Sequence, residues 1–118
     1  MRYALLIYSP EKEWQARPEA EKTAIYHEYV AFSRSLRESG KYEVGEPLQP
    51  TSAATTVRRR EGRTLTTDGP FAETREQLGG LYIVSAANLD EAIAMAERIP
   101  SARFGAVEVR PILDLDMS

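Results

Sequence analysis

Cysteine is absent from the 118-residue chain, and histidine occurs once, as His27. Without a thiol the protein can form no disulfide, no iron–sulfur cluster and no thiolate zinc site, and it has no cysteine nucleophile. A single imidazole also excludes a metal site built from several histidines of one chain. The composition therefore predicts neither a cofactor nor a metal ion.

Long apolar runs and an excess of basic residues are missing as well. The apolar run Tyr3–Tyr8 stops before Pro10 and is too short for a signal-peptide core or a membrane span. The formal net charge is −3, whereas proteins that bind nucleic acid usually carry a basic surface. The cluster Arg58–Arg60 would split between the two faces of a strand, as is typical of a solvated hairpin tip. We expect a cytoplasmic protein with no membrane or nucleic-acid partner.

The first half of the chain shows a strand–helix–strand pattern. Tyr3–Tyr8 predicts a central strand buried on both faces, and the polar residues Glu11–Arg17, which include the lone Trp14, predict a loop. A helix should run from Pro18 to about Ser39. Its expected core-facing stripe is Ile25, Tyr29, Phe32 and Leu36. The following residues, 41 to 48, predict a strand in which Pro47 marks a break or an edge position.

The second half begins with a hairpin and ends with another strand–helix–strand unit. Two strand-like runs, 55 to 59 and 63 to 67, flank a turn at Glu61-Gly62. A strong strand lies within 78 to 86, and Asn88 is a helix N-cap. The last strand spans 106 to 113. The expected apolar stripe of the second helix is Ala92, Ile93, Ala96 and Ile99, with Pro100 ending the helix.

This order of elements predicts an α+β, ferredoxin-like βαββαβ fold with an inserted β-hairpin and an antiparallel sheet, formed by residues 1–118 as one domain. Two helices can cover only one face of such a sheet. The apolar strands would leave the other face exposed on a monomer. We therefore expect a homodimer that packs through the sheet face, with roughly 800 Å² buried per partner.

One polar stretch, Thr66 to Gly80, has two interpretations. Asp68-Gly69-Pro70 is a turn signal, and the pair Gly79-Gly80 indicates a bulge or a close backbone approach. Between them, Glu73 and Arg75 bring opposite charges close together. The stretch is either a loop that fixes strand register or the lining of a small site.

The same stretch resembles the signature of a known family. The run Thr67-Asp-Gly-Pro-Phe-Ala-Glu-Thr-Arg-Glu-Gln-Leu-Gly-Gly80 is similar to that of the YCII-related proteins, DGPF subgroup, and the likeness extends to Gly45–Pro50, Leu89–Ala92 and Val107–Pro111. The resemblance implies a dimeric α/β-barrel of ferredoxin-like subunits. It also implies an association of the subgroup with extracytoplasmic-function sigma factors, and for some members a His–Asp pair as active site. It implies no particular reaction.

The His–Asp pair carries over only in part. Asp68 matches the Asp of the signature, but the helix position that matches the His is Tyr29. His27 falls on the opposite side of that helix and is expected to face solvent. Tyr29 is a poor general base at neutral pH, because the ordinary pKa of a phenol is near 10. A Tyr29–Asp68 hydrogen bond would still keep a polar pocket in place.

Two functions follow from these residues. The first is a small-molecule enzyme with an Asp-centred polar pocket between the first helix and the sheet. Its catalytic candidates are Asp68, Tyr29 and His27, with Glu73 and Arg75 as a polar rim. The alternative is a ligand-sensing or regulatory binding module with a small-molecule ligand or a sigma-factor partner. In that case the hairpin and Trp14 are natural contact elements.

Overall fold

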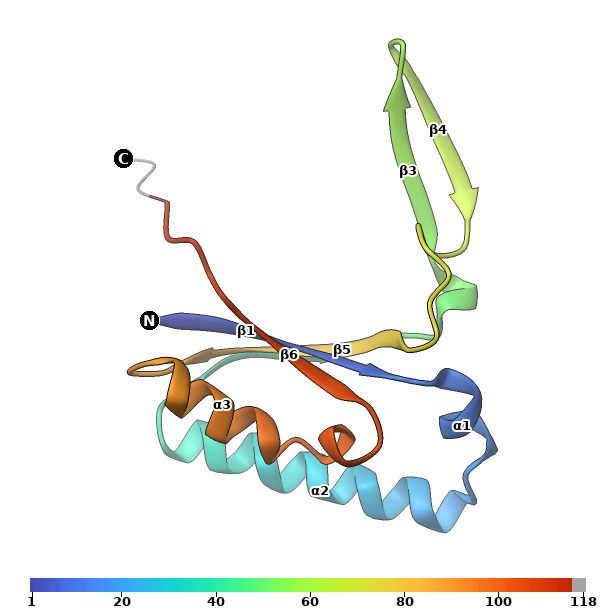
Figure 1. The fold of residues 1–118 in the computed structure, drawn as a ribbon. Coiled ribbons are helices and arrows are strands. Elements are labelled where there is room, and N and C mark those ends of the chain that lie inside the picture. The colour runs from blue at the N-terminus through green and yellow to red at the C-terminus, as the bar shows by residue number, and fades with distance from the viewer. Residues whose placement is uncertain (116–118) are drawn as a thin grey trace.

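The protein is an α+β, ferredoxin-like fold, seen in a computed structural model that describes residues 1–115. Four antiparallel strands form the sheet in the order β2-β5-β1-β6. Helices α2 and α3 lie on one side of it (Figure 1). The bounds of the sheet strands are β1 Arg2–Ser9, β2 Tyr42–Pro47, β5 Gln77–Ser85 and β6 Ala106–Pro111, and those of the two helices are α2 Glu19–Glu38 and α3 Leu89–Glu97.

Helix α2 begins and ends where its sequence predicts. Pro18 occupies the N-cap position, and Glu19 and Glu21 place carboxylates in the first turn, which the helix dipole favours. Ser39 is the C-cap residue. Three of the four expected stripe residues, Ile25, Phe32 and Leu36, are buried, while Tyr29 is half-buried.

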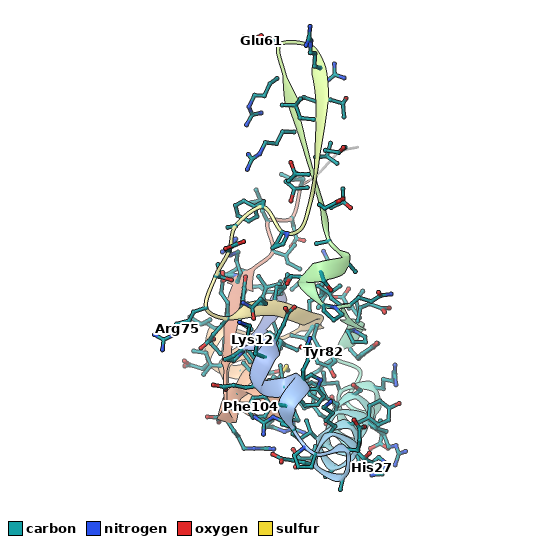
Figure 2. The ribbon with its side chains drawn as sticks, turned by 90° about the vertical axis from the view of Figure 1, so that its right-hand side faces the viewer. Lys12, His27, Glu61, Arg75, Tyr82 and Phe104 are labelled. Carbon is teal, nitrogen blue, oxygen red and sulfur yellow. The ribbon has the colours of Figure 1, made fainter. Side chains whose placement is uncertain are left out.

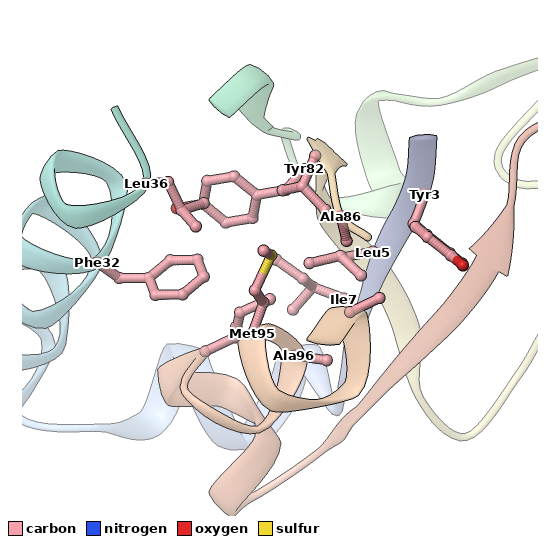
Figure 3. Close-up of a cluster of buried hydrophobic side chains, with 12 residues drawn as sticks. Tyr3, Leu5, Ile7, Phe32, Leu36, Tyr82, Ala86, Met95 and Ala96 are labelled. Carbon is pink, nitrogen blue, oxygen red and sulfur yellow. The ribbon is translucent and has the colours of Figure 1, made fainter. Parts of the chain in front are cut away.

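The core lies between the sheet and the two helices (Figure 3). Tyr3, Leu5 and Ile7 alternate along β1 and all point to this side, as period-2 strand geometry requires. Helix α3 contributes Ala92, Met95 and Ala96, and Asn88 caps it by accepting a hydrogen bond from the Glu91 amide at 3.0 Å. The prediction was wrong for Ile93, which is 46% exposed, because Met95 takes the core-facing place.

A two-stranded hairpin projects from the body, as predicted (Figure 1). It consists of β3 (Thr55–Arg60) and β4 (Arg63–Asp68), joined by a turn in which Glu61 and Gly62 both have positive φ. We call residues 55–68 the arm. The tip at Glu61 lies far from the rest of the chain (Figure 2). At the base, the Gly69 amide donates to the Ala54 carbonyl at 2.7 Å, which ties the arm to the body.

The Gly79-Gly80 pair produces the predicted irregularity in the sheet. The register between β1 and β5 shifts there, so that Ile7 faces Gly80 and Tyr8 faces Leu78. A side chain on Gly80 would also press on the backbone oxygen of Glu46 in β2, with an approach of 3.1 Å. The pair is therefore a bulge with a close backbone neighbour.

The polar segment before α2 is a helix, not the predicted loop. Helix α1 spans Glu11–Ala16 and has no side-chain N-cap. It is fixed by tertiary contacts, because the Glu11 carboxylate accepts hydrogen bonds from the Thr51 amide and hydroxyl at 2.7 and 2.8 Å. Thr51 begins the short 3₁₀ helix η1 (Thr51–Ala53). A six-residue helix held this way leaves little periodic signal in the sequence.

The face of the sheet away from the helices is apolar and uncovered in the single chain, and we call it the open face. Pairing across the strands places Leu6 opposite Leu81 and Ala4 opposite Ile83 on this face. Their side chains are only half-buried, so the prediction of burial on both faces of β1 does not hold in the single chain. No helix in residues 1–115 is long and apolar enough to cross a membrane.

Candidate functional site

A cleft of about 590 Å³ lies between α2, α1, the edge strand β2 and the start of β5. Helix α2 supplies one wall through side chains that recur every three or four residues. This spacing makes a second stripe along the helix, beside the stripe that faces the core. The members of the second stripe are Lys22, Tyr26, Tyr29, Val30, Ser33 and Arg37.

The hydroxyl groups of Tyr29 and Ser101 form a hydrogen bond in the cleft wall. Ser101 is buried and belongs to the short 3₁₀ helix η2 (Pro100–Arg103) after α3. Burial raises the pKa of Tyr29, and this effect outweighs the lowering caused by its hydrogen bond to Ser101. Tyr29 therefore stays a neutral phenol, which can donate or accept a hydrogen bond but does not act as a base at neutral pH.

A second hydroxyl pair lies on the same wall, one turn further along α2. The Ser33 and Tyr82 hydroxyls are 2.7 Å apart, and the Tyr82 ring packs edge-on against Phe32 with centroids 5.2 Å apart. Burial is also the main reason that the pKa of Tyr82 is raised. The two tyrosines thus provide two fixed, uncharged hydrogen-bonding groups.

The guanidinium of Arg37 lies beside this second pair. Its Cζ atom is 4.3 Å from the centroid of the Tyr42 ring, a stacking distance that holds the charged group at the end of the cleft. Among residues 1–115, Arg37 takes part in no ion pair. This end of the cleft therefore combines a cation with two hydroxyl groups.

The mouth of the cleft is mainly apolar, while the lining of its other end also includes Glu11, Gln15 and Lys22. Trp14 of α1 is half-buried there. Tyr26 is 63% exposed, Val30 39% and Leu48 45%, so these side chains form an apolar rim at the entrance. The sequence suggested Trp14 as a contact element of a binding module, and in the structure it lies in the wall of the cleft.

The predicted site residues do not come together in the single chain. Tyr29 lines the cleft, but Asp68 is exposed at the end of β4 and His27 is exposed on α2, and neither lines it. The expected Tyr29–Asp68 hydrogen bond is not formed, because Tyr29 pairs with Ser101. Figure 2 shows His27 at the outer side of α2, well away from the labelled Arg75.

Glu73 and Arg75 occupy a separate place. Both are exposed on the loop between β4 and β5, and they line a depression beside Glu11 and Thr51. The predicted polar rim is therefore not part of the cleft between α2 and the sheet. Within residues 1–115 no group of three His, Asp or Glu side chains has a geometry that could hold a metal ion.

Sequence reasoning missed Ser33, Arg37, Tyr82 and Ser101 as site residues. The first two had a readable signal, since they continue the stripe Lys22, Tyr26 and Val30 at helical spacing. Ser101 had none, because its position depends on how η2 folds back against α2.

The fold and the cleft define a class of small ferredoxin-like α+β proteins with a hairpin inserted before the third sheet strand. The sequence profile of the YCII-related domain matches residues 1–116. A protein of Rhizobium meliloti (strain 1021) that is described as uncharacterized is 40% identical over 114 residues, which cover 95% of this chain and 92% of that relative. The chain belongs to the YCII-related family. Membership of the DGPF subgroup stays a prediction.

Proposed function

We propose that the protein is a binding module for a small organic molecule, which it holds in the cleft between α2 and the sheet. One observation carries the proposal: aromatic and aliphatic side chains wall a cleft of about 590 Å³, and a few hydroxyl groups converge on it. Ligand sites in proteins typically have this size and this mixture of apolar walls with a few fixed polar groups. Such a module would sense or carry its ligand.

Proton-transfer chemistry has weaker support from this geometry. Two titratable groups in the wall, the half-buried Tyr29 and the buried Tyr82, have raised pKa values and stay protonated. The Glu11 carboxylate already accepts two hydrogen bonds from Thr51. An enzyme with Asp68 as base, and with Tyr29 or His27 as its partner, stays a prediction that requires Asp68 to reach a cleft other than the one in its own chain.

Trp14 offers a direct test of ligand binding. It is the only tryptophan, and because it lines the cleft, a bound bromoaryl compound should quench its fluorescence. We expect saturable quenching by 3-(4-bromophenyl)propanamide. The variant Val30→Glu, which places a charge in the apolar rim, should weaken binding about tenfold, since a desolvated charge is costly.

The control for this titration is Val57→Glu, which makes the same change on the arm, at a side chain 61% exposed and outside the cleft. It should bind the amide as the parent protein does. Quenching that rises linearly without saturation, to the same degree in all three proteins, would contradict the proposal.

We also propose that a second copy of the chain covers the open face. Leu6, Leu81 and Ile83 form the apolar centre of this face, and two ion pairs, Arg2–Glu43 and Glu108–Arg110, lie toward its edges. An apolar centre with a polar rim is the usual anatomy of a protein interface. The sigma-factor partner that the resemblance implies stays a prediction.

Light scattering after size-exclusion chromatography tests the homodimer. We expect a dimer at micromolar concentration, and a monomer for Leu6→Lys, because the change puts a charge in the centre of the interface. The control Ile93→Lys alters an exposed side chain on the helical side of the molecule and should remain dimeric. Circular dichroism confirms that both variants fold. A monomeric parent protein would refute this proposal.

A further inference from the structure

We propose that the ligand of the cleft is an organic anion, whose acidic group binds at Arg37 and whose apolar body lies along the aromatic wall toward Trp14. This inference rests on the proposed function, which it extends by naming the chemical class of the ligand. The inference depends on which charged side chains around the cleft already have ion-pair or hydrogen-bond partners.

Arg37 is a charged lining residue for which residues 1–115 supply no ion-pair partner. Stacking on Tyr42 at 4.3 Å orients the guanidinium without using its N–H donors. The hydroxyls of Ser33 and Tyr82, which also line the cleft, face each other at 2.7 Å. A carboxylate that reached this end would meet a planar cation that can bind it through two hydrogen bonds.

The other charged residues that line the cleft either have a partner or direct their side chain to the other face of the sheet. Lys22 is 3.5 Å from the Glu19 carboxylate, and Glu11 is held by Thr51. Glu46 is exposed and pairs in register with Leu81, so its side chain belongs to the sheet face opposite that of Tyr82. These engagements leave Arg37 as the lining charge that selects for an anion.

The length of the wall sets the shape of the ligand. Lys22 and Arg37 are fifteen residues apart on α2, which corresponds to about 22 Å of helix. Tyr29, Val30 and Tyr26 fill the interval between them. The cleft is therefore long enough for an aromatic ring and an aliphatic linker that extend from the acidic group at Arg37.

A pair of isosteric probes separates the contribution of charge from that of shape. The probes are 3-(4-bromophenyl)propionate and its uncharged amide, and isothermal titration calorimetry at low ionic strength gives both dissociation constants. We expect the acid to bind about five- to tenfold more tightly than the amide. The gain is modest because Arg37 is exposed, and solvent weakens its ionic interactions.

Arg37→Met should remove this preference, because it takes away the cation and retains much of the apolar stem. Arg37→Lys should keep part of it. The control Arg34→Met removes an exposed arginine from the same helix outside the cleft and should behave as the parent protein does. Equal binding of acid and amide in the parent and in Arg37→Met would overturn the inference and leave ligand binding intact. Failure of both probes to saturate would overturn the proposed function as well.

Discussion

Replacing Gly105 with alanine is expected to cost about 3 kcal/mol or more of the free energy of unfolding. A Cβ atom at this position would collide with the backbone oxygen of Tyr8, and it would lie 2.9 and 3.0 Å from the Cβ and Cα atoms of Ser9. These atoms belong to the end of β1, which pairs with both β5 and β6 and cannot shift alone. The loss exceeds that of ordinary overpacking, because the obstacle is backbone.

Urea denaturation followed by circular dichroism measures the effect, and Gly79→Ala is the matched control. A Cβ on Gly79 meets no atom within 4 Å, so the same substitution there should change the free energy of unfolding by less than about 1 kcal/mol. Most domains are stable by only about 5–15 kcal/mol, so Gly105→Ala should shift the midpoint strongly. Equal midpoints for the two variants would show that the approach of Gly105 to β1 is not rigid.

Tyr82→Ala should have the second large effect, a loss of about 3–5 kcal/mol in the free energy of unfolding. The ring is 6% exposed and joins the core to the cleft, because it packs against Phe32 on one side and Tyr42 on the other. Its removal leaves a void that these neighbours cannot fill without losing their own contacts. Thermal and urea denaturation both report this loss.

Tyr82→Phe separates the ring from its hydroxyl. The phenylalanine keeps the packing and loses one hydrogen bond, to Ser33, so we expect a loss of about 1 kcal/mol. If the phenylalanine variant were as unstable as the alanine variant, the hydroxyl pair and not the packed ring would be the main contribution. One urea denaturation series with the parent protein and both variants shows how much stability comes from the packed ring and how much from the hydroxyl.

The order of strands and helices was predictable because local signals agree with the fold. Pro18 at the start of α2 and Asn88 at the start of α3 both act at the positions where the structure has them. Helix α1 was missed, since Glu11 reaches Thr51, forty residues away, to hold it. Ile93 was misplaced because α3 is short, and the sequence alone does not say which border of its apolar stripe meets the sheet.

The candidate site was predicted only in part, for a reason of geometry. Tyr29 was named because it matches the His position of the resembled family, and helical periodicity agrees by placing it on the inner side of the helix. Its expected partner Asp68 depends on the direction in which the arm leaves the body, which no local pattern determines. Ser101 comes to Tyr29 through the fold of η2, so their contact is a property of tertiary structure.

The arm has a consequence for the cooperativity of folding. The side chains of β3 and β4 are almost all exposed, and their backbone hydrogen bonds within the sheets join only these two strands. An isolated two-stranded hairpin is marginally stable in water. The arm can therefore open at a free energy well below that of global unfolding, while β1 and β5 stay closed. Mutations in the arm should therefore hardly change the free energy of unfolding of the domain. Selection on the sequence of the arm would have to act through binding rather than through stability.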